Sequence, residues 1–265
     1  MKLGVIGCGK MGRALVGGIL KAGIVPPGNT RVFDNYTPAA WEMGSELGVA
    51  MAQSNEEVVS ESDVILLCVK PQGFLEMLGD IGSSEGKLLI SIAAGVQISS
   101  IESATSGRHR VVRVMPNTPA LVGKGASGFA LGTTATAADA ALTESLLGAV
   151  GYVCAVSEPD LDAVTAVSGS GPAYVFLMIE ALVAGGIELG LEPDIAGALA
   201  AHTVAGAAEL LLQSGDSPGQ LRENVTSPNG TTFAALESFR SDHFEDIVKR
   251  AVTAAADRSK ELGEA

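Results

Sequence analysis

The feature that most constrains the fold is the hexapeptide Gly-Cys-Gly-Lys-Met-Gly at positions 7–12, which stands between a short apolar run and a helical pattern. In a strand–turn–helix unit, the first glycine permits a tight turn and the second lets the backbone approach a pyrophosphate. The third allows close packing of the helix, whose N-terminus attracts the anion. The hexapeptide therefore predicts a dinucleotide-binding turn, and a purely structural glycine-rich turn is the alternative.

Short runs rich in Val, Ile and Leu recur along the first half of the chain, each bounded by turn or charged residues. They occupy positions 2–7, 30–34, 63–69, 87–93 and 110–115. The segments between them that suit crossover helices are 10–22, 38–47 and 72–80. Alternation of buried apolar strands with helices is typical of the doubly wound α/β fold, so we expect a Rossmann-like parallel sheet.

The pattern changes after about residue 157. Two further candidate strands, 125–131 and 152–156, flank a helical stretch at 136–149. Beyond them the sequence is rich in Ala, Leu and Glu and is interrupted only by short turns. We therefore expect a dinucleotide-binding, Rossmann-like domain at 1–157 and an all-helical domain at 158–265.

Composition limits the partners. With 265 residues, 47% of them hydrophobic, the chain can bury a large core. Its net charge of −13 disfavours nucleic acid and anionic membranes, which need clustered Lys and Arg, and favours a small polar substrate. The three cysteines and three histidines are widely separated, so we expect no metal site and no disulfide framework, and the cytoplasm is the simplest location.

The apolar stretch 172–191 is nearly long enough to cross a bilayer. Glu180 lies in its middle, Glu188 follows, and no basic residues flank it, so a buried helix is favoured over a membrane span. A helix that is apolar on most faces needs partners on all sides, which indicates the core of an oligomer.

Asp34 ends the second predicted strand, at the spacing expected for a carboxylate that accepts the adenosine ribose hydroxyls. Such a carboxylate repels a 2′-phosphate, and residues 35–37 supply no compensating Arg. On this residue NADH is favoured over NADPH, although either is compatible with the glycine turn. The alternative is that Asp34 only caps the following turn.

Two loops follow the carboxyl ends of strands, Cys-Val-Lys-Pro-Gln at 68–72 and Ser-Ile-Ala-Ala-Gly at 91–95. Ligands of open α/β sheets bind at these ends, so both loops should face the cofactor. Lys70 either reaches a phosphate or ribose or is a solvated lysine. The complete set of candidate cofactor-binding residues is Gly7, Cys8, Gly9, Lys10, Met11, Gly12, Asp34, Asn55, Val69, Lys70, Pro71, Ala93, Ala94 and Gly95.

The chain resembles the pyrroline-5-carboxylate reductase family over essentially its whole length. The resemblance is carried by GCGKMG (7–12), VKP (69–71), SIAAGV (91–96), MPNTPA (115–120), SGSGPAYVF (168–176), SPGQL (217–221) and NVTSPNGTT (224–232). It implies reduction of 1-pyrroline-5-carboxylate to proline with NADPH or NADH. It also implies a helical C-terminal domain that interlocks with a second subunit, often within a ring of dimers.

The resemblance places the substrate at residues 227–232. Thr232 matches the hydroxyl that the family is proposed to use on the imine nitrogen, and backbone N–H groups of Asn229, Gly230 and Thr231 can hold the substrate carboxylate. Ser227 can add a hydroxyl contact. The alternative is a helix N-cap whose Thr residues satisfy local backbone groups. Asn229 departs from the family's usual Gly, but Asn tolerates positive φ, so the loop shape can survive.

Two other functions are compatible with parts of the sequence. β-Hydroxyacid dehydrogenases share the layout but use a catalytic Lys on the first long helix of the second domain, and no lysine occurs between Lys124 and Lys249. A non-catalytic NAD-sensing protein would not need the 224–232 segment. Ser170 in Gly-Ser-Gly resembles a nucleophile elbow, but it precedes a proline at a helix start, so we expect the turn to pack against the sheet instead.

Overall fold

The computed structural model describes residues 1–264. These residues form two compact units. The first comprises Met1–Ser170 together with the C-terminal residues from Ala254 onward, and the second is Gly171–Thr253. All the strands of the described residues lie in the first unit.

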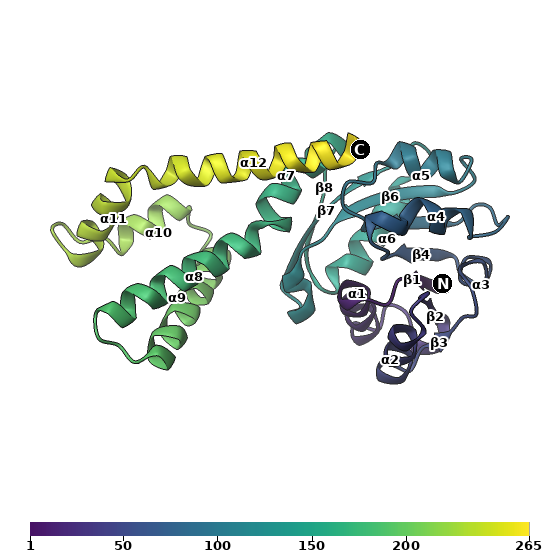
Figure 1. Cartoon of the computed structure of the whole chain (residues 1–265), viewed down its shortest axis with the longest axis horizontal. Helices are drawn as coiled ribbons and strands as arrows, with labels where there is room; N and C mark the ends of the chain where they lie inside the picture. Colours follow the sequence, from purple (N-terminus) through teal and green to yellow (C-terminus); the bar gives the residue numbers. More distant parts are fainter. Residues whose placement is uncertain (265) are drawn as a thin grey trace. The chain divides into compact units, whose positions relative to one another are not determined.

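The first unit is built on one sheet of eight strands in the order β3-β2-β1-β4-β5-β6-β7-β8 (Figure 1). The strands are β1 (Leu3–Ile6), β2 (Thr30–Phe33), β3 (Ala50–Met51), β4 (Val64–Leu67), β5 (Leu88–Ser91), β6 (Arg110–Met115), β7 (Gly125–Leu131) and β8 (Gly151–Ala155). The strand order reverses between β1 and β4. In open α/β sheets, ligands bind beyond the carboxyl ends of the strands at such a reversal.

Helices cover both faces of the sheet. On one face pack α1 (Lys10–Lys21), α2 (Thr37–Leu47) and α6 (Ala137–Gly148). On the other pack α3 (Asn55–Glu61), α4 (Phe74–Gly79), α5 (Ile98–Ala104) and α7 (Leu161–Val164). Along β4, Leu66 belongs to the first core cluster and Ile65 and Leu67 to the second. Because both faces are covered, the strands read as unbroken apolar runs, and the expected Rossmann-like sheet is confirmed.

β7 and β8 depart from the parallel arrangement of the other six strands. β7 runs antiparallel to β6, with Met115 opposite Gly128, and β8 runs parallel to β7. Residues 116–124 join β6 to β7 and contain only a short 3₁₀ helix, η3 (Thr118–Val122). A parallel crossover needs about a dozen residues or more, so this connection turns the chain back instead.

Three short elements are not predicted by the sequence patterns: β3, α3 and α5. β3 has two residues, and α3 has seven. α3 begins after Ser54, whose hydroxyl accepts a hydrogen bond from the Glu57 N–H at 3.1 Å. Segments this short cannot show a periodic apolar pattern, so their structure depends on caps and on the neighbours that pack on them.

The second unit is helical. It contains α8 (Gly171–Glu188), α9 (Pro193–Ser214), α10 (Pro218–Asn224), α11 (Thr231–Ser241) and the first part of α12 (Phe244–Glu264). α8 and α9 pack closely, since a Cβ added to Gly186 would lie 3.3 Å from the Cβ of Ala196. Among the described residues of this unit, only Ala196 and Ala200 are buried. The unit on its own therefore has almost no core.

Large apolar side chains are exposed on this unit instead. Phe176 is 60% exposed, Leu177 67% and Leu212 78%. The helical stretches Glu158–Glu188 and Pro193–Ser214 are long and apolar enough to cross a membrane by length and composition alone, a test that core helices of soluble proteins also pass. A surface of this kind is typical of a protein–protein interface.

The compact units divide later than the expected boundary between residues 157 and 158. Leu161 is buried in the second core cluster, and a Cβ on Gly128 of β7 would lie 2.9 Å from the Val164 side chain. Residues 158–170 thus pack on the sheet although no strand follows β8 in the described chain. The predicted boundary between 157 and 158 marks the end of the strand pattern, whereas the first compact unit continues to Ser170. The predicted boundary therefore stays a prediction.

Candidate active site

The glycine turn after β1 has a separate physical requirement at each glycine. Gly7 has φ +101°, and a Cβ there would lie 2.6 Å from the carbonyl carbon of Cys68. A Cβ on Gly12 would lie 2.4 Å from the carbonyl oxygen of Gly7, so only glycine allows α1 to pack this closely. Gly9 has no atom within 4 Å of its added Cβ. Gly7 and Gly12 are therefore required by packing, whereas Gly9 leaves space open in front of the turn.

α1 begins directly behind this turn. Its N-cap is Gly9, and no side chain caps the helix. The first N–H groups of a helix lack intrahelical acceptors and carry the positive end of the helix dipole. An anionic group such as a pyrophosphate fits this end of α1, as the sequence predicts.

A cleft of about 410 Å³ lies at the carboxyl ends of the central strands. Six of the predicted cofactor-binding residues line it: Gly7, Gly9, Asp34, Asn55, Val69 and Lys70. The lining also contains residues that the sequence analysis did not select, including Asn35, Glu76 and Asp80. The sequence gives little indication that these three residues line a site, because polar residues at the start of a loop or on a short helix are common on any protein surface. This lining thus carries three carboxylates, those of Asp34, Glu76 and Asp80, and the ammonium group of Lys70.

Asp34 uses both carboxylate oxygens inside the protein. Its Oδ2 accepts a hydrogen bond from the Cys8 N–H at 2.7 Å, and its Oδ1 accepts one from the Tyr36 N–H at 2.8 Å. Asp34 thus caps the following turn, as the alternative interpretation predicted. An ionised carboxylate has about four lone-pair sites, so Asp34 can also accept a ribose hydroxyl.

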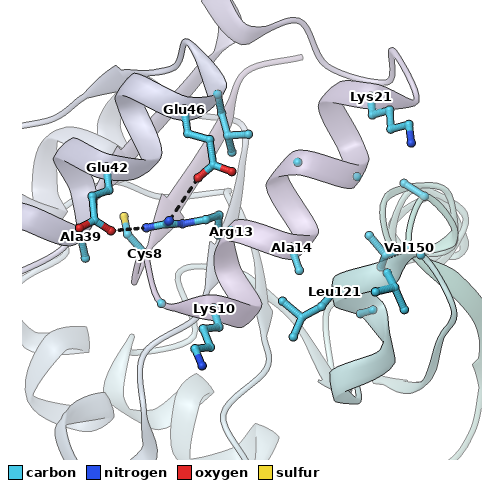
Figure 2. A pocket seen from close by; sticks show the side chains of 18 residues that line it. Cys8, Lys10, Arg13, Ala14, Lys21, Ala39, Glu42, Glu46, Leu121 and Val150 are labelled. Carbon is cyan, nitrogen blue, oxygen red and sulfur yellow. Dashed lines mark hydrogen bonds and ion pairs between the residues drawn. The ribbon is translucent and has the colours of Figure 1, made fainter. Parts of the chain in front are cut away.

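The remaining predicted cofactor residues lie outside this cleft. Cys8, Gly9 and Lys10 line a neighbouring hollow of about 740 Å³ along α1, of which Gly9 is shared with the cleft (Figure 2). Met11 packs beside the first core cluster. Gly12 packs against the Gly7 carbonyl, as described above. The other four residues follow the ends of strands: Pro71 follows β4, and Ala93, Ala94 and Gly95 follow β5.

Arg13, on α1, lines this hollow (Figure 2). Its guanidinium lies 3.0 Å from Oε2 of Glu42 and 3.1 Å from Oε2 of Glu46, both on α2. A guanidinium already paired with two carboxylates is a poor partner for a phosphate. Arg13 is thus paired inside the protein, and the other cations that line the hollow are Lys10 and Lys21.

Two cysteines that are distant in the sequence meet at the glycine turn. Burial raises the pKa of the Cys8 thiol to about 12, with Asp34 adding to the shift, and burial likewise raises the pKa of the Cys68 thiol to about 12. Thiols with such pKa values stay protonated at neutral pH and react slowly. In residues 1–264, no group of three or more His, Cys, Asp or Glu side chains is arranged to hold a metal ion.

The 227–232 segment forms a tight turn followed by a helix. Asn229 has φ +58°, in the left-handed region, and the Gly230 N–H donates to the carbonyl of Ser227 at 3.0 Å. The expectation that Asn can serve where the family has Gly is met, because Asn adopts this conformation at low cost. Gly230 is then the N-cap of α11, without a side-chain cap.

Thr231 and Thr232 are the first two residues of α11 and do not cap it. Thr232 is half-buried, and its hydroxyl makes no hydrogen bond to any other described residue. The capping alternative is therefore wrong for this helix start. The start of α11 therefore presents the N–H groups of Asn229 and Thr231 and the Thr232 hydroxyl without hydrogen-bond partners in the described chain.

The Ser-Gly-Ser-Gly-Pro turn packs on the end of β6, as expected. A Cβ on Gly169 would lie 2.6 Å from Cε of Met115, and Asn117 Nδ2 donates to the Ser168 carbonyl at 3.0 Å. Residues Thr165–Gly169 form a π-helical turn, which the sequence did not predict. Asn117 also accepts from the Ala126 N–H at 2.8 Å, so the Met-Pro-Asn-Thr-Pro-Ala loop is rigidly held.

Comparison with known proteins matches both halves of the chain. Residues 158–262 match a family described as pyrroline-5-carboxylate reductase dimerisation, and residues 2–95 match one described as NADP oxidoreductase, coenzyme F420-dependent. The pyrroline-5-carboxylate reductase of Arabidopsis thaliana is 43% identical over an alignment of 267 residues, which covers 99% of this chain and 96% of the plant protein.

Solved structures agree with this match. The pyrroline-5-carboxylate reductase of Coxiella burnetii gives a TM-score of 0.93 at 38% identity and covers 98% of both chains. The pyrroline carboxylate reductase of Plasmodium falciparum, solved with NADP bound, gives a TM-score of 0.85 at 34% identity and covers 99% of this chain and 98% of its own. The similarity to these two structures thus extends over nearly the whole chain.

Proposed function

This chain belongs to the pyrroline-5-carboxylate reductase family, and we propose that the cleft beyond β1 and β4 and the segment 227–232 carry its reaction. The enzyme uses NAD(P)H to reduce the C=N bond of 1-pyrroline-5-carboxylate, which gives L-proline in the last step of proline biosynthesis. The observation that carries the assignment of the substrate segment is the start of α11, where left-handed Asn229 leads into a helix without a side-chain cap.

The cofactor half of the proposal rests on the glycine turn. Residues 7–12 would hold the pyrophosphate at the uncapped start of α1, and Asp34 would accept the adenosine ribose hydroxyls. Ala93, Ala94 and Gly95 follow β5, which lies on the other side of β1 from Asp34, and would adjoin the nicotinamide half. Bound NAD(P)H supplies the hydride.

The substrate half rests on residues 227–232. The N–H groups of Asn229 and Thr231 would bind the substrate carboxylate, which the dipole of α11 also favours. The Gly230 N–H, predicted as a third donor, instead donates to the Ser227 carbonyl and holds the turn in shape. The Ser227 hydroxyl would add a further contact. A carboxylate fixed in this way orients the ring, so that the imine carbon has one defined position.

Thr232 would hydrogen-bond the ring nitrogen through its free hydroxyl. The imine nitrogen is basic enough to carry a proton itself, and reduction converts a cationic C=N bond into a neutral amine. No strong side-chain acid is therefore needed, and one oriented hydrogen bond is sufficient. The hydroxyl would donate to the lone pair that forms on nitrogen as the carbon takes up the hydride, so the bond strengthens in the transition state.

The protein is a homo-oligomer, as the match to the dimerisation family indicates. We further propose a dimer in which α8 and α9 pack against helices of a second copy, because these helices expose most of their apolar side chains. Assembly of dimers into a ring and a cytoplasmic location are parts of the same proposal. Neither nucleic acid nor a membrane is expected as a partner, given the net charge of −13.

Steady-state kinetics with 1-pyrroline-5-carboxylate against NADH and NADPH tests the proposed function. We expect cofactor oxidation to match proline formation mole for mole. A protein that binds the cofactor but reduces no imine would fit the NAD-sensing alternative. Oxidation of β-hydroxyacids without imine reduction would fit the dehydrogenase alternative.

A further inference from the structure

The loop between β5 and α5, residues 92–97, is anchored at its end by a residue that follows the last strand. The Ile98 N–H, at the start of α5, donates to Oε1 of Glu158 at 2.7 Å. The same oxygen lies 3.0 Å from NH1 of Arg113, whose side chain is 10% exposed. A carboxylate held by a buried guanidinium has one position, so Glu158 fixes where the loop ends.

The middle of this loop is covered by the end of α12. Gly95 has φ +76°, and a Cβ added to it would lie 3.1 Å from the carbonyl oxygen of Leu262. From the other side, a Cβ on Gly263 would lie 3.3 Å from the carbonyl oxygen of Gly95. The two backbones are thus in direct contact and leave no room for side chains between them.

The end of α12 is itself held in place. The Ser259 hydroxyl donates to Oδ1 of Asp162 at 2.6 Å, and Ser259 is only 6% exposed. Asp162 lies on α7, directly after the short turn that carries Glu158. Both contacts on the 92–97 loop therefore come from one connected piece of structure, which we name the loop clamp: Glu158, Asp162, Ser259, Leu262 and Gly263.

The clamped loop lies at one end of the candidate cofactor site. β5 is separated by β1 and β4 from β2, which is followed directly by Asp34. Three strand spacings correspond to about 14 Å across the sheet. With Asp34 at the adenosine end, the loop after β5 is on the nicotinamide side of the pyrophosphate.

We propose that the loop clamp positions Gly95 for the nicotinamide half of the cofactor, so that Ser259, Leu262 and Gly263 are positioning residues for the reductase. The proposal rests on the proposed function in one respect, namely that Ala93, Ala94 and Gly95 adjoin the nicotinamide. A preorganised loop binds its ligand without first being ordered, and loss of the clamp adds that ordering cost to binding.

Two variants release the clamp. A chain that ends at Lys260 lacks Leu262 and Gly263, and Ser259→Ala removes the hydrogen bond to Asp162. The matched control is Thr253→Ala on the same helix, because the Thr253 hydroxyl bonds only to the Lys249 carbonyl within α12. Binding of NADH and of ADP-ribose, which lacks the nicotinamide, is measured by calorimetry in the absence of imine.

For the shortened chain we expect NADH to bind about tenfold more weakly while ADP-ribose affinity changes less than about twofold. Ser259→Ala should show the same selectivity with about a threefold loss, and Thr253→Ala should bind both ligands like the wild type. An equal loss for both ligands, or unchanged NADH binding in the shortened chain, would overturn the clamp. If the shortened chain does not fold, the selectivity of Ser259→Ala decides.

Failure of the clamp and failure of the proposed function give different results. Binding is measured without substrate, so an enzyme that does not reduce the imine would overturn the proposed function and still report on the clamp. An active shortened enzyme with wild-type NADH affinity would overturn the clamp alone.

Discussion

Thr232 is the residue on which the proposed chemistry depends most. We expect Thr232→Ala to lower kcat/KM for the imine by about ten- to a hundredfold, because one hydrogen bond of about 1–3 kcal/mol is lost in the transition state. Cofactor affinity should hardly change, since the glycine turn belongs to the other compact unit. Steady-state kinetics together with a cofactor titration measure the two effects.

Thr231→Ala is the matched control for this prediction. Thr231 occupies the preceding position at the same helix start and contributes its backbone N–H, which the substitution keeps. Its effect should be clearly smaller. If Thr232→Ala retains the wild-type kcat/KM while folded and oligomeric, the segment acts through its backbone alone.

Asp34 bears on the choice of cofactor. Its carboxylate is fixed by the N–H groups of Cys8 and Tyr36, so it cannot easily turn away from a 2′-phosphate. We expect kcat/KM to be higher with NADH, or any NADPH preference to be weak. A preference for NADPH of about a hundredfold, near 2.7 kcal/mol, would show that other residues bind the phosphate.

At the residue scale, the sequence could predict what single side chains and glycines require. Positive φ at Gly7 and Asn229 and the close contact at Gly12 follow from rules about backbone geometry. The bond between Asp34 and the Cys8 N–H joins positions 26 apart, and its geometry exists only once β1 and β2 are paired. Contacts of this kind could not be predicted from the sequence.

A buried histidine directly precedes β6. His109 is 1% exposed, and neither ring nitrogen has a hydrogen-bond partner in the described chain. Burial, with Arg108 and Lys87 nearby, lowers the pKa of His109, so the ring binds a proton less readily in the folded protein than in the unfolded chain. The unfolded chain protonates at its ordinary pKa of about 6.5 and therefore binds more protons below that pH. His109 should make the fold less stable as pH falls below about 6.5.

Thermal unfolding at pH 7.5 and pH 5.5 checks this effect. We expect the Tm of the wild type to fall more between the two pH values than that of His109→Gln, by a few degrees, since about 2–4 °C corresponds to 1 kcal/mol in a chain of this size. Equal pH dependence of the wild type and His109→Gln would show that His109 is not responsible.

At the element scale, long periodic segments were predictable and short ones were not. The strands from β1 to β8 other than β3 follow from apolar runs, because both faces of the sheet are covered. α3 and α5 have seven residues each, too few for a clear period. The π-helical turn at Thr165–Gly169 was not predicted either, and Gly169 within it lies against Met115, a contact that no local pattern encodes.

At the scale of the whole molecule, the sequence predicted where α/β structure gives way to helices. It did not predict that the end of the last helix belongs to the first unit. α12 begins in the helical unit and ends against Gly95 of the first. Nothing in the composition of the last residues indicates that contact. The loop clamp thus depends on a long-range contact that only the folded chain contains.

The second unit cannot be stable by itself, and this determines the assembly we expect. Of its described residues only Ala196 and Ala200 are buried, while Phe176, on α8, is 60% exposed. We expect sedimentation to show at least a dimer at micromolar concentration, because a second copy is the simplest cover for such a surface. Phe176→Glu should weaken assembly and activity together, whereas Trp41→Glu, at a 62% exposed aromatic of the first unit, should leave both unchanged. A stable and active monomer would mean that α8 and α9 are covered by something other than a second copy of this chain.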